Sequence, residues 1–83
     1  MTVHPGDMAD RVRRFAWEST PLGPMDNWPV SLRATVDLIL DSSFPMFVAW
    51  GSAHNIIYND AYIPILGSRH PGALGLPFSV LWS

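Results

Sequence analysis

The chain has 83 residues, a formal net charge of −2 at pH 7, 48% hydrophobic residues and no cysteine. This length predicts one small domain, and the lack of cysteine excludes disulfides, thiolate zinc sites and cysteine nucleophiles. The acidic balance gives no nucleic-acid footprint, and no apolar run approaches the roughly 18–20 residues of a membrane-spanning helix. We therefore expect a cytoplasmic domain whose scarce polar surface leaves apolar area for a partner to cover.

Residues 1–18 are predicted to form an amphipathic helix with a frayed start. Asp7 is a suitable N-cap for a helix that runs to about Glu18. Acidic residues precede arginines by four positions, which favours a salt-bridged helix face over a phosphate-binding patch. Its apolar residues fall on one face at helical spacing: Met8, Val12, Phe15 and Ala16. Such a short helix is marginal alone, and we favour docking on its own domain over a dimerisation role.

Residues 19–43 are predicted to be a linker followed by a second helix. Prolines make the stretch Ser19–Pro29 a rigid loop, with Leu22, Met25 and Trp28 packed beneath it. A helix is then predicted over 29–41, because its apolar residues form a stripe at helical spacing. That stripe consists of Leu32, Val36, Ile39 and Leu40.

A β-hairpin is predicted from Phe44 to Tyr58. Apolar residues occupy both alternating faces of the first strand, 44–50, so both faces require cover. Gly51–His54 has the length and chemistry of a hairpin loop, which places His54 in solvent. Ile56–Tyr58 supplies the return strand, with high β propensity.

Short helices are predicted after the hairpin. Asn59 or Asp60 can cap the first, and Gly67 can end it. Because Pro64 removes one backbone hydrogen bond, this helix should be brief, kinked or partly 3₁₀. Pro71–Leu74 is expected to form one helical turn, and Phe78–Trp82 begins a further apolar element.

Four segments together resemble the N-terminal part of a PAS sensory domain, of the type at the front of bacterial sensor histidine kinases. The segments are PLGPMDNWPVSLRATVDLIL, SSFPMFVAWG, IIYNDAYIPILG and RHPGALGLPFSVLW. The resemblance spans roughly Trp17 to Trp82. In that family a five-stranded antiparallel sheet is flanked by helices, and its concave face can hold a small ligand.

The resemblance implies a truncated, PAS-like α+β fold with N-terminal cap helices, a two-stranded antiparallel hairpin and short helices. Residues 19–83 would form a partial PAS domain, in which 19–43 are the linker and cap helix and 44–83 the strands and short helices. The last three strands of the family and any output module would lie after Ser83, so we expect a truncated copy or a fragment. Two strands with an unpaired edge are marginal in water, so such a chain should be weakly stable, oligomeric, or completed by another chain.

Each candidate site residue also has a simpler explanation. If a small ligand binds, the pocket-facing candidates are Met46, Val48, Trp50, Ile56, Tyr58 and Tyr62, although we favour plain core for them. Capping chemistry explains Asn59 and Asp60 without a ligand. His70 precedes Pro71 and has no second ligand at metal spacing, so a turn residue is favoured over a metal or haem ligand. We predict no cofactor and no metal.

Two functional hypotheses follow, and neither is enzymatic. The serines lack histidine and acid partners in a defined arrangement, and no phosphate-binding loop is present, so no catalytic residue is nominated. The first hypothesis is the sensory input region of a histidine kinase in a two-component phosphorelay, completed by the rest of a PAS domain and a kinase module. The second is a stand-alone half-domain that acts as a protein-interaction or dimerisation module through its open sheet edge.

Overall fold

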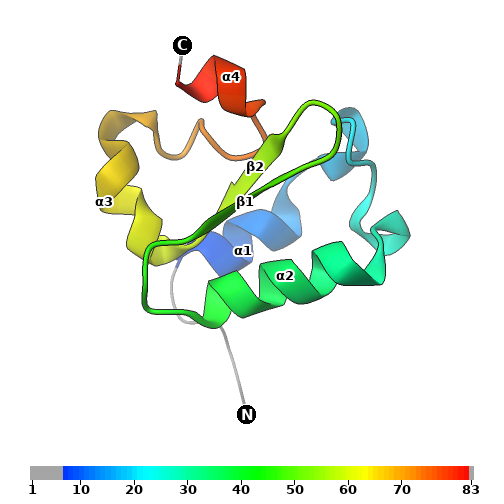
Figure 1. Ribbon diagram of the computed structural model, residues 1–83, viewed down its shortest axis with the longest axis horizontal. Coiled ribbons are helices and arrows are strands. Elements are labelled where there is room, and N and C mark those ends of the chain that lie inside the picture. Colours follow the sequence, from blue (N-terminus) through cyan, green and yellow to red (C-terminus); the bar gives the residue numbers. More distant parts are fainter. Residues whose placement is uncertain (1–6, 83) are drawn as a thin grey trace.

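The computed structural model describes residues 7–82, so the frayed start predicted for residues 1–6 lies outside the described residues. Within that range the chain forms four α-helices and one two-stranded antiparallel sheet, joined by short 3₁₀ turns (Figure 1). The predicted α+β class is confirmed at this level. One core of buried apolar side chains draws on all four helices and on strand β2, Asn55–Tyr58.

Helix α1 spans Asp7–Arg14 and is shorter than predicted. It stops because Trp17 folds back beneath it: the buried indole Nε1 donates to the Val12 carbonyl at 2.7 Å, and the chain continues as a 3₁₀ turn, Trp17–Ser19. Ala16 is therefore exposed, although it was predicted to share the buried face with Met8 and Val12.

The prediction that Asp7 caps α1 is also wrong. The backbone N–H groups of Asp7 and Met8 both donate to Oδ1 of Asp60, each at 3.0 Å. The helix thus begins against a carboxylate 53 residues away in sequence. Asp7 lies within the first turn, where its own carboxylate accepts from Arg11 Nε at 2.5 Å.

Helix α2, Val30–Asp41, confirms the helix predicted over 29–41. All members of its predicted apolar stripe are buried: Leu32, Val36, Ile39 and Leu40. The preceding loop packs as expected, with Trp28 buried and Leu22 and Met25 partly buried against the core. The Trp28 indole Nε1 donates to the Gly23 carbonyl at 2.9 Å, which fastens the loop to the start of the helix.

Strands β1, Phe47–Trp50, and β2 form the predicted hairpin, with Phe47 opposite Tyr58 and Trp50 opposite Asn55. The first strand begins at Phe47 rather than at Phe44, whose side chain is 74% exposed. Asn59 accounts for this, because its side chain binds the Phe44 carbonyl and the Met46 N–H and so takes the place of a partner strand before Phe47.

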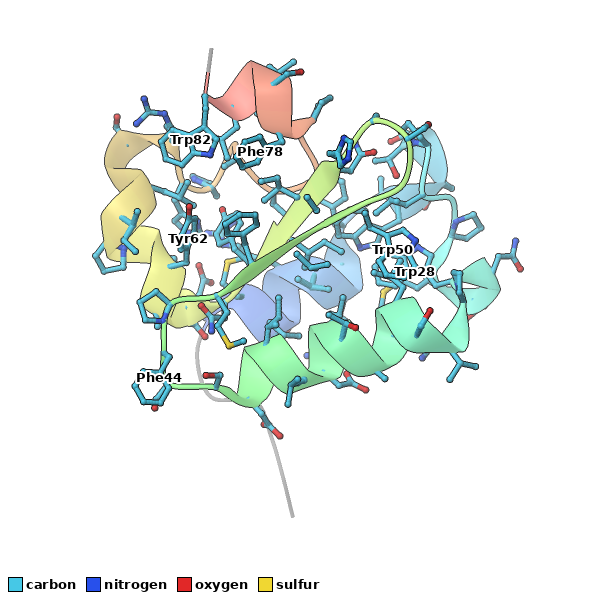
Figure 2. The ribbon with its side chains drawn as sticks, viewed as in Figure 1. Trp28, Phe44, Trp50, Tyr62, Phe78 and Trp82 are labelled. Carbon is cyan, nitrogen blue, oxygen red and sulfur yellow. The ribbon has the colours of Figure 1, made fainter. Side chains whose placement is uncertain are left out.

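The two faces of the hairpin differ in their surroundings. Paired residues share a face, so Val48, Trp50, Asn55 and Ile57 form one side, here called the helix face. Phe47, Ala49, Ile56 and Tyr58 form the other, here called the aromatic face. Helix α2 contacts both strands, and Figure 2 places Trp50 on its side of the hairpin, with Tyr62 and Phe78 toward the short helices.

The segment after the hairpin is brief and partly 3₁₀, as predicted. A 3₁₀ turn over Asp60–Tyr62 leads into helix α3, Ile63–Leu66, which gives way at Gly67 to a second 3₁₀ turn. Residues 71–75 form consecutive turns instead of the helical turn expected at Pro71–Leu74, because Gly75 turns the chain toward β2 and donates to the Ile56 carbonyl at 2.8 Å. Helix α4 follows at Phe78–Leu81.

Candidate functional site

The outer edge of β1 is the first component of the candidate site. Asn59 N–H donates to the Met46 carbonyl at 3.2 Å. With the register of the strands, this bond identifies the residue pairs whose N–H and C=O groups bond across the ladder. In an antiparallel pair these groups alternate inward and outward along each strand. Val48 and Trp50 therefore bond to β2, whereas the N–H and C=O groups of Phe47 and Ala49 point away from it.

The outer edge of β2, in contrast, is covered by the chain itself. Ile56 N–H donates to the Leu76 carbonyl at 2.9 Å, and Phe78 N–H donates to the His54 carbonyl at 2.9 Å. Pro77 forms an isolated antiparallel bridge with Asn55. Within residues 7–82, β2 is the single strand paired with β1, so the open edge of the sheet belongs to β1.

An apolar groove of about 410 Å³ lies beside this edge on the aromatic face. Phe47 and Phe78 both line it; their rings stack on each other with centroids 5.8 Å apart and remain 39% and 40% exposed. The groove is lined by Phe47, Ala49, Ala53, His54, Phe78 and Ser79. Both faces of the first strand were expected to be covered, but Tyr62 and Phe78 cover the aromatic face only in part and leave Phe47 exposed.

The six predicted pocket residues are divided between the two faces of the hairpin. Val48 and Trp50 lie on the helix face, partly buried against the core, as is Met46 just before the strand. The other three belong to the aromatic face: Ile56 and Tyr58 are buried in β2, and Tyr62 contacts both Tyr58 and Phe47. None of the six lines the groove, so their role toward a ligand stays a prediction.

The groove residues Phe47, Ala49 and Phe78 were missed from the sequence. Period-two alternation already separates Phe47 and Ala49 from Val48 and Trp50, which was the available signal. The contribution of Phe78 depends on the turn at Gly75, and local patterning gives no indication of it. His54 is exposed, as predicted for the loop, and it contributes to the rim of the groove.

A polar cluster joins α1 to the buried end of β2. The Tyr58 hydroxyl and His70 Nδ1 are 2.7 Å apart, and His70 Nε2 lies 3.5 Å from the Asp7 carboxylate. The Arg11 guanidinium bound to Asp7 lowers the pKa of that carboxyl, and burial raises the pKa of Tyr58 to about 12. A phenol so hard to ionise stays a hydrogen-bonding group at neutral pH. His70, expected to be a plain turn residue, therefore also connects two elements.

Asn59 and Asp60 both act as capping residues, and Asn59 caps the turn after the hairpin, as predicted. The Asn59 side chain accepts from the Tyr62 N–H at 3.2 Å and caps the 3₁₀ turn, while Asp60 caps α1. The described residues contain no cluster of three or more His, Cys, Asp or Glu side chains that could hold a metal ion. In the same range, no helix is long and apolar enough to cross a membrane.

Comparisons with family models, curated proteins and solved structures found no match to this chain. The open edge of β1, the groove beside it and the residues that hold them are the features that bear on function.

Proposed function

We propose that the protein is a regulatory binding module of the PAS type, the input region of a bacterial signal-transduction protein such as a sensor histidine kinase. The observation that carries the proposal is the open edge of β1 next to an exposed aromatic groove. The PAS-like sequence segments support it, as does the placing of α2 on one face of the hairpin and Phe78 of α4 on the other.

The edge supplies the binding chemistry. The outward N–H and C=O groups of Phe47 and Ala49 hydrogen-bond to water unless a strand lies alongside, and an added strand replaces that water with ladder bonds. Side chains that the added strand places on the aromatic face would enter the groove. This gives selectivity for apolar residues at alternate positions of the added strand. In the sensory reading, the added strand comes from the remainder of a PAS sheet, and a signal is a shift in the packing of that sheet against α1 and α2.

A second candidate function is a stand-alone interaction module that uses the same edge. One observation favours it: the segment Gly75–Phe78 already closes the outer edge of β2, and the core buries Ile56, Ile57 and Tyr58 completely. The hairpin is thereby supported within residues 7–82 by its own helices and by this segment. An isolated two-stranded hairpin would lack both supports.

Site-specific photo-crosslinking in the producing cell tests the proposal. A photoreactive phenylalanine analogue replaces Phe47 at the edge, and the same analogue at Phe44, which is more exposed but lies before β1, serves as the matched control. We expect strong crosslinking from position 47, and mass spectrometry then identifies the crosslinked peptide. A segment of the same polypeptide beyond residue 83 or a kinase component favours the sensory reading, and a separate chain favours the interaction module. Equal, weak crosslinking from both positions contradicts strand addition at β1.

A further inference from the structure

We propose that the strand added to β1 in the isolated chain is β1 of a second copy, in an antiparallel pair centred on Val48. This inference rests on the proposed strand addition and names its partner. Phe47 and Ala49 carry the outward hydrogen-bonding groups, and they lie symmetrically on either side of Val48. An antiparallel copy related by a two-fold axis through that point therefore meets each N–H with a C=O and each C=O with an N–H.

Side-chain size is also self-complementary at this register. Phe47 of one copy lies opposite Ala49 of the other, so each large ring faces a small side chain on the same face of the sheet. The groove of about 410 Å³ runs beside Ala49 and is lined by apolar residues. It receives the ring of the second copy, which in the free chain is 39% exposed. The pairing buries on both copies the aromatic surface that each leaves open.

The edge of β1 carries none of the features that prevent two edge strands from pairing. The strand sequence Phe-Val-Ala-Trp contains no charge and no proline, whereas protected edges use lysine, proline or bulges. The charged residues of the molecule gather elsewhere, notably on α1, where Asp7 and Asp10 pair with arginines. Two identical edges therefore meet without like-charge repulsion. The pairing yields a four-stranded sheet whose outer edges are covered by the Gly75–Phe78 segments.

Size-exclusion chromatography with light scattering on the purified chain gives the first readout. We expect a concentration-dependent rise from 9.2 kDa toward twice that mass. Ala49→Pro removes one outward N–H without removing a bond to β2, so it should raise the dissociation constant by about tenfold or more. Phe47→Ala should weaken the dimer as well, with Phe44→Ala as the matched aromatic control. Circular dichroism checks that each variant keeps its fold.

A crosslink then tests the register. Since the chain has no cysteine, Val48→Cys introduces a single thiol at the two-fold axis, where opposite residues come close enough for a disulfide. We expect mild oxidation to give a disulfide dimer from Val48→Cys and little from Ser52→Cys in the hairpin turn. A monomer at all concentrations, or a dimer that Ala49→Pro leaves intact, overturns the second-copy proposal. The proposed function fails separately, if Phe47 crosslinks no more than Phe44 in the cell.

Discussion

Asn59 is buried and holds together three parts of the chain that are distant in sequence. Its Nδ2 donates to the carbonyls of Ile39 at 2.9 Å and Phe44 at 2.7 Å, and its Oδ1 accepts from Met46 N–H at 3.1 Å. The end of α2, the start of β1 and the turn after β2 thus meet at one amide. The primary amide supplies both the N–H donors and the acceptor oxygen that these bonds use.

Replacing Asn59 with alanine should destabilise the fold strongly. The change leaves buried backbone groups without partners, at about 1–3 kcal/mol for each group left unsatisfied, so we expect a loss of about 2–4 kcal/mol. Urea denaturation followed by circular dichroism measures it. Asn27→Ala, at an exposed asparagine, should change the free energy of unfolding by less than about 0.5 kcal/mol. Similar losses for the two variants contradict the bridging role of Asn59.

Ionisation of Tyr58 should lower the stability of the fold at alkaline pH. Its pKa rises from 10.0 to about 12 on burial, so the folded state favours the neutral phenol. The corresponding stability is fully present below about pH 10 and is lost as the pH rises from about 10 to about 12. We expect the free energy of unfolding to fall over this range in the natural chain and to fall less in Tyr58→Phe. Parallel pH profiles for the two proteins would contradict burial of the hydroxyl.

Helix α1 is held by contacts that its own sequence does not supply. Asp60 accepts from the first two N–H groups of the helix, and Trp17 Nε1 donates to the carbonyl of Val12 near its end. The exposed ion pairs of Asp10 with Arg13 and Arg14 lie on the solvent side. Exposed pairs contribute little, so the long-range cap should matter more than the charges within the helix.

Substitutions at Asp60 test this ranking. Asp60→Ala removes the cap and should cost about 1 kcal/mol, while Asp60→Asn keeps a side-chain oxygen and should cost less. Asp10→Ala removes only exposed pairs and should cost less than about 0.5 kcal/mol. Thermal unfolding of the three variants gives the order directly. A larger loss for Asp10→Ala than for Asp60→Ala would contradict it.

Gly75 turns the chain onto the edge of β2 where Phe15 packs against the backbone. Its φ is +83°, and an added Cβ would lie 2.7 Å from the Phe15 ring. Gly23 has a φ of +71° with open space around it, which makes it a matched control for backbone strain alone. We expect Gly75→Ala to destabilise the fold by about 1 kcal/mol more than Gly23→Ala, as measured by urea denaturation. Equal losses of stability would show that the Phe15 ring moves aside for the added methyl group without cost.

Local sequence patterns predicted the elements whose structure depends mainly on their own residues. The stripe from Leu32 to Leu40 was sufficient for α2, and β propensity with a short turn was sufficient for β2. The end of α1 and its cap were missed because Trp17 and Asp60 act through tertiary contacts. The candidate groove includes Phe47 and Ala49, which the sequence did not single out, since their importance depends on an edge that only the folded chain defines.

The molecule as a whole is asymmetric about its two strands. The helix face of the hairpin packs against the core, the edge of β2 is closed by Gly75–Phe78, and the edge of β1 stays open. The cluster of Asp7, His70 and Tyr58 connects α1 to β2. Tyr62 contacts both Tyr58 of β2 and Phe47 of β1. A strand that binds at β1 therefore contacts Phe47. Packing through Tyr62 and Tyr58 connects Phe47 to α1.

Residue-resolved amide hydrogen exchange tests the open edge most directly. In the dilute chain, the amides of Val48 and Trp50 should exchange slowly because they bond to β2, whereas those of Phe47 and Ala49 should exchange quickly. Raising the protein concentration should then slow Phe47 and Ala49 selectively as a second strand pairs with them. If Phe47 and Ala49 are already as protected as Val48 in the dilute monomer, the edge is occupied and the account is contradicted.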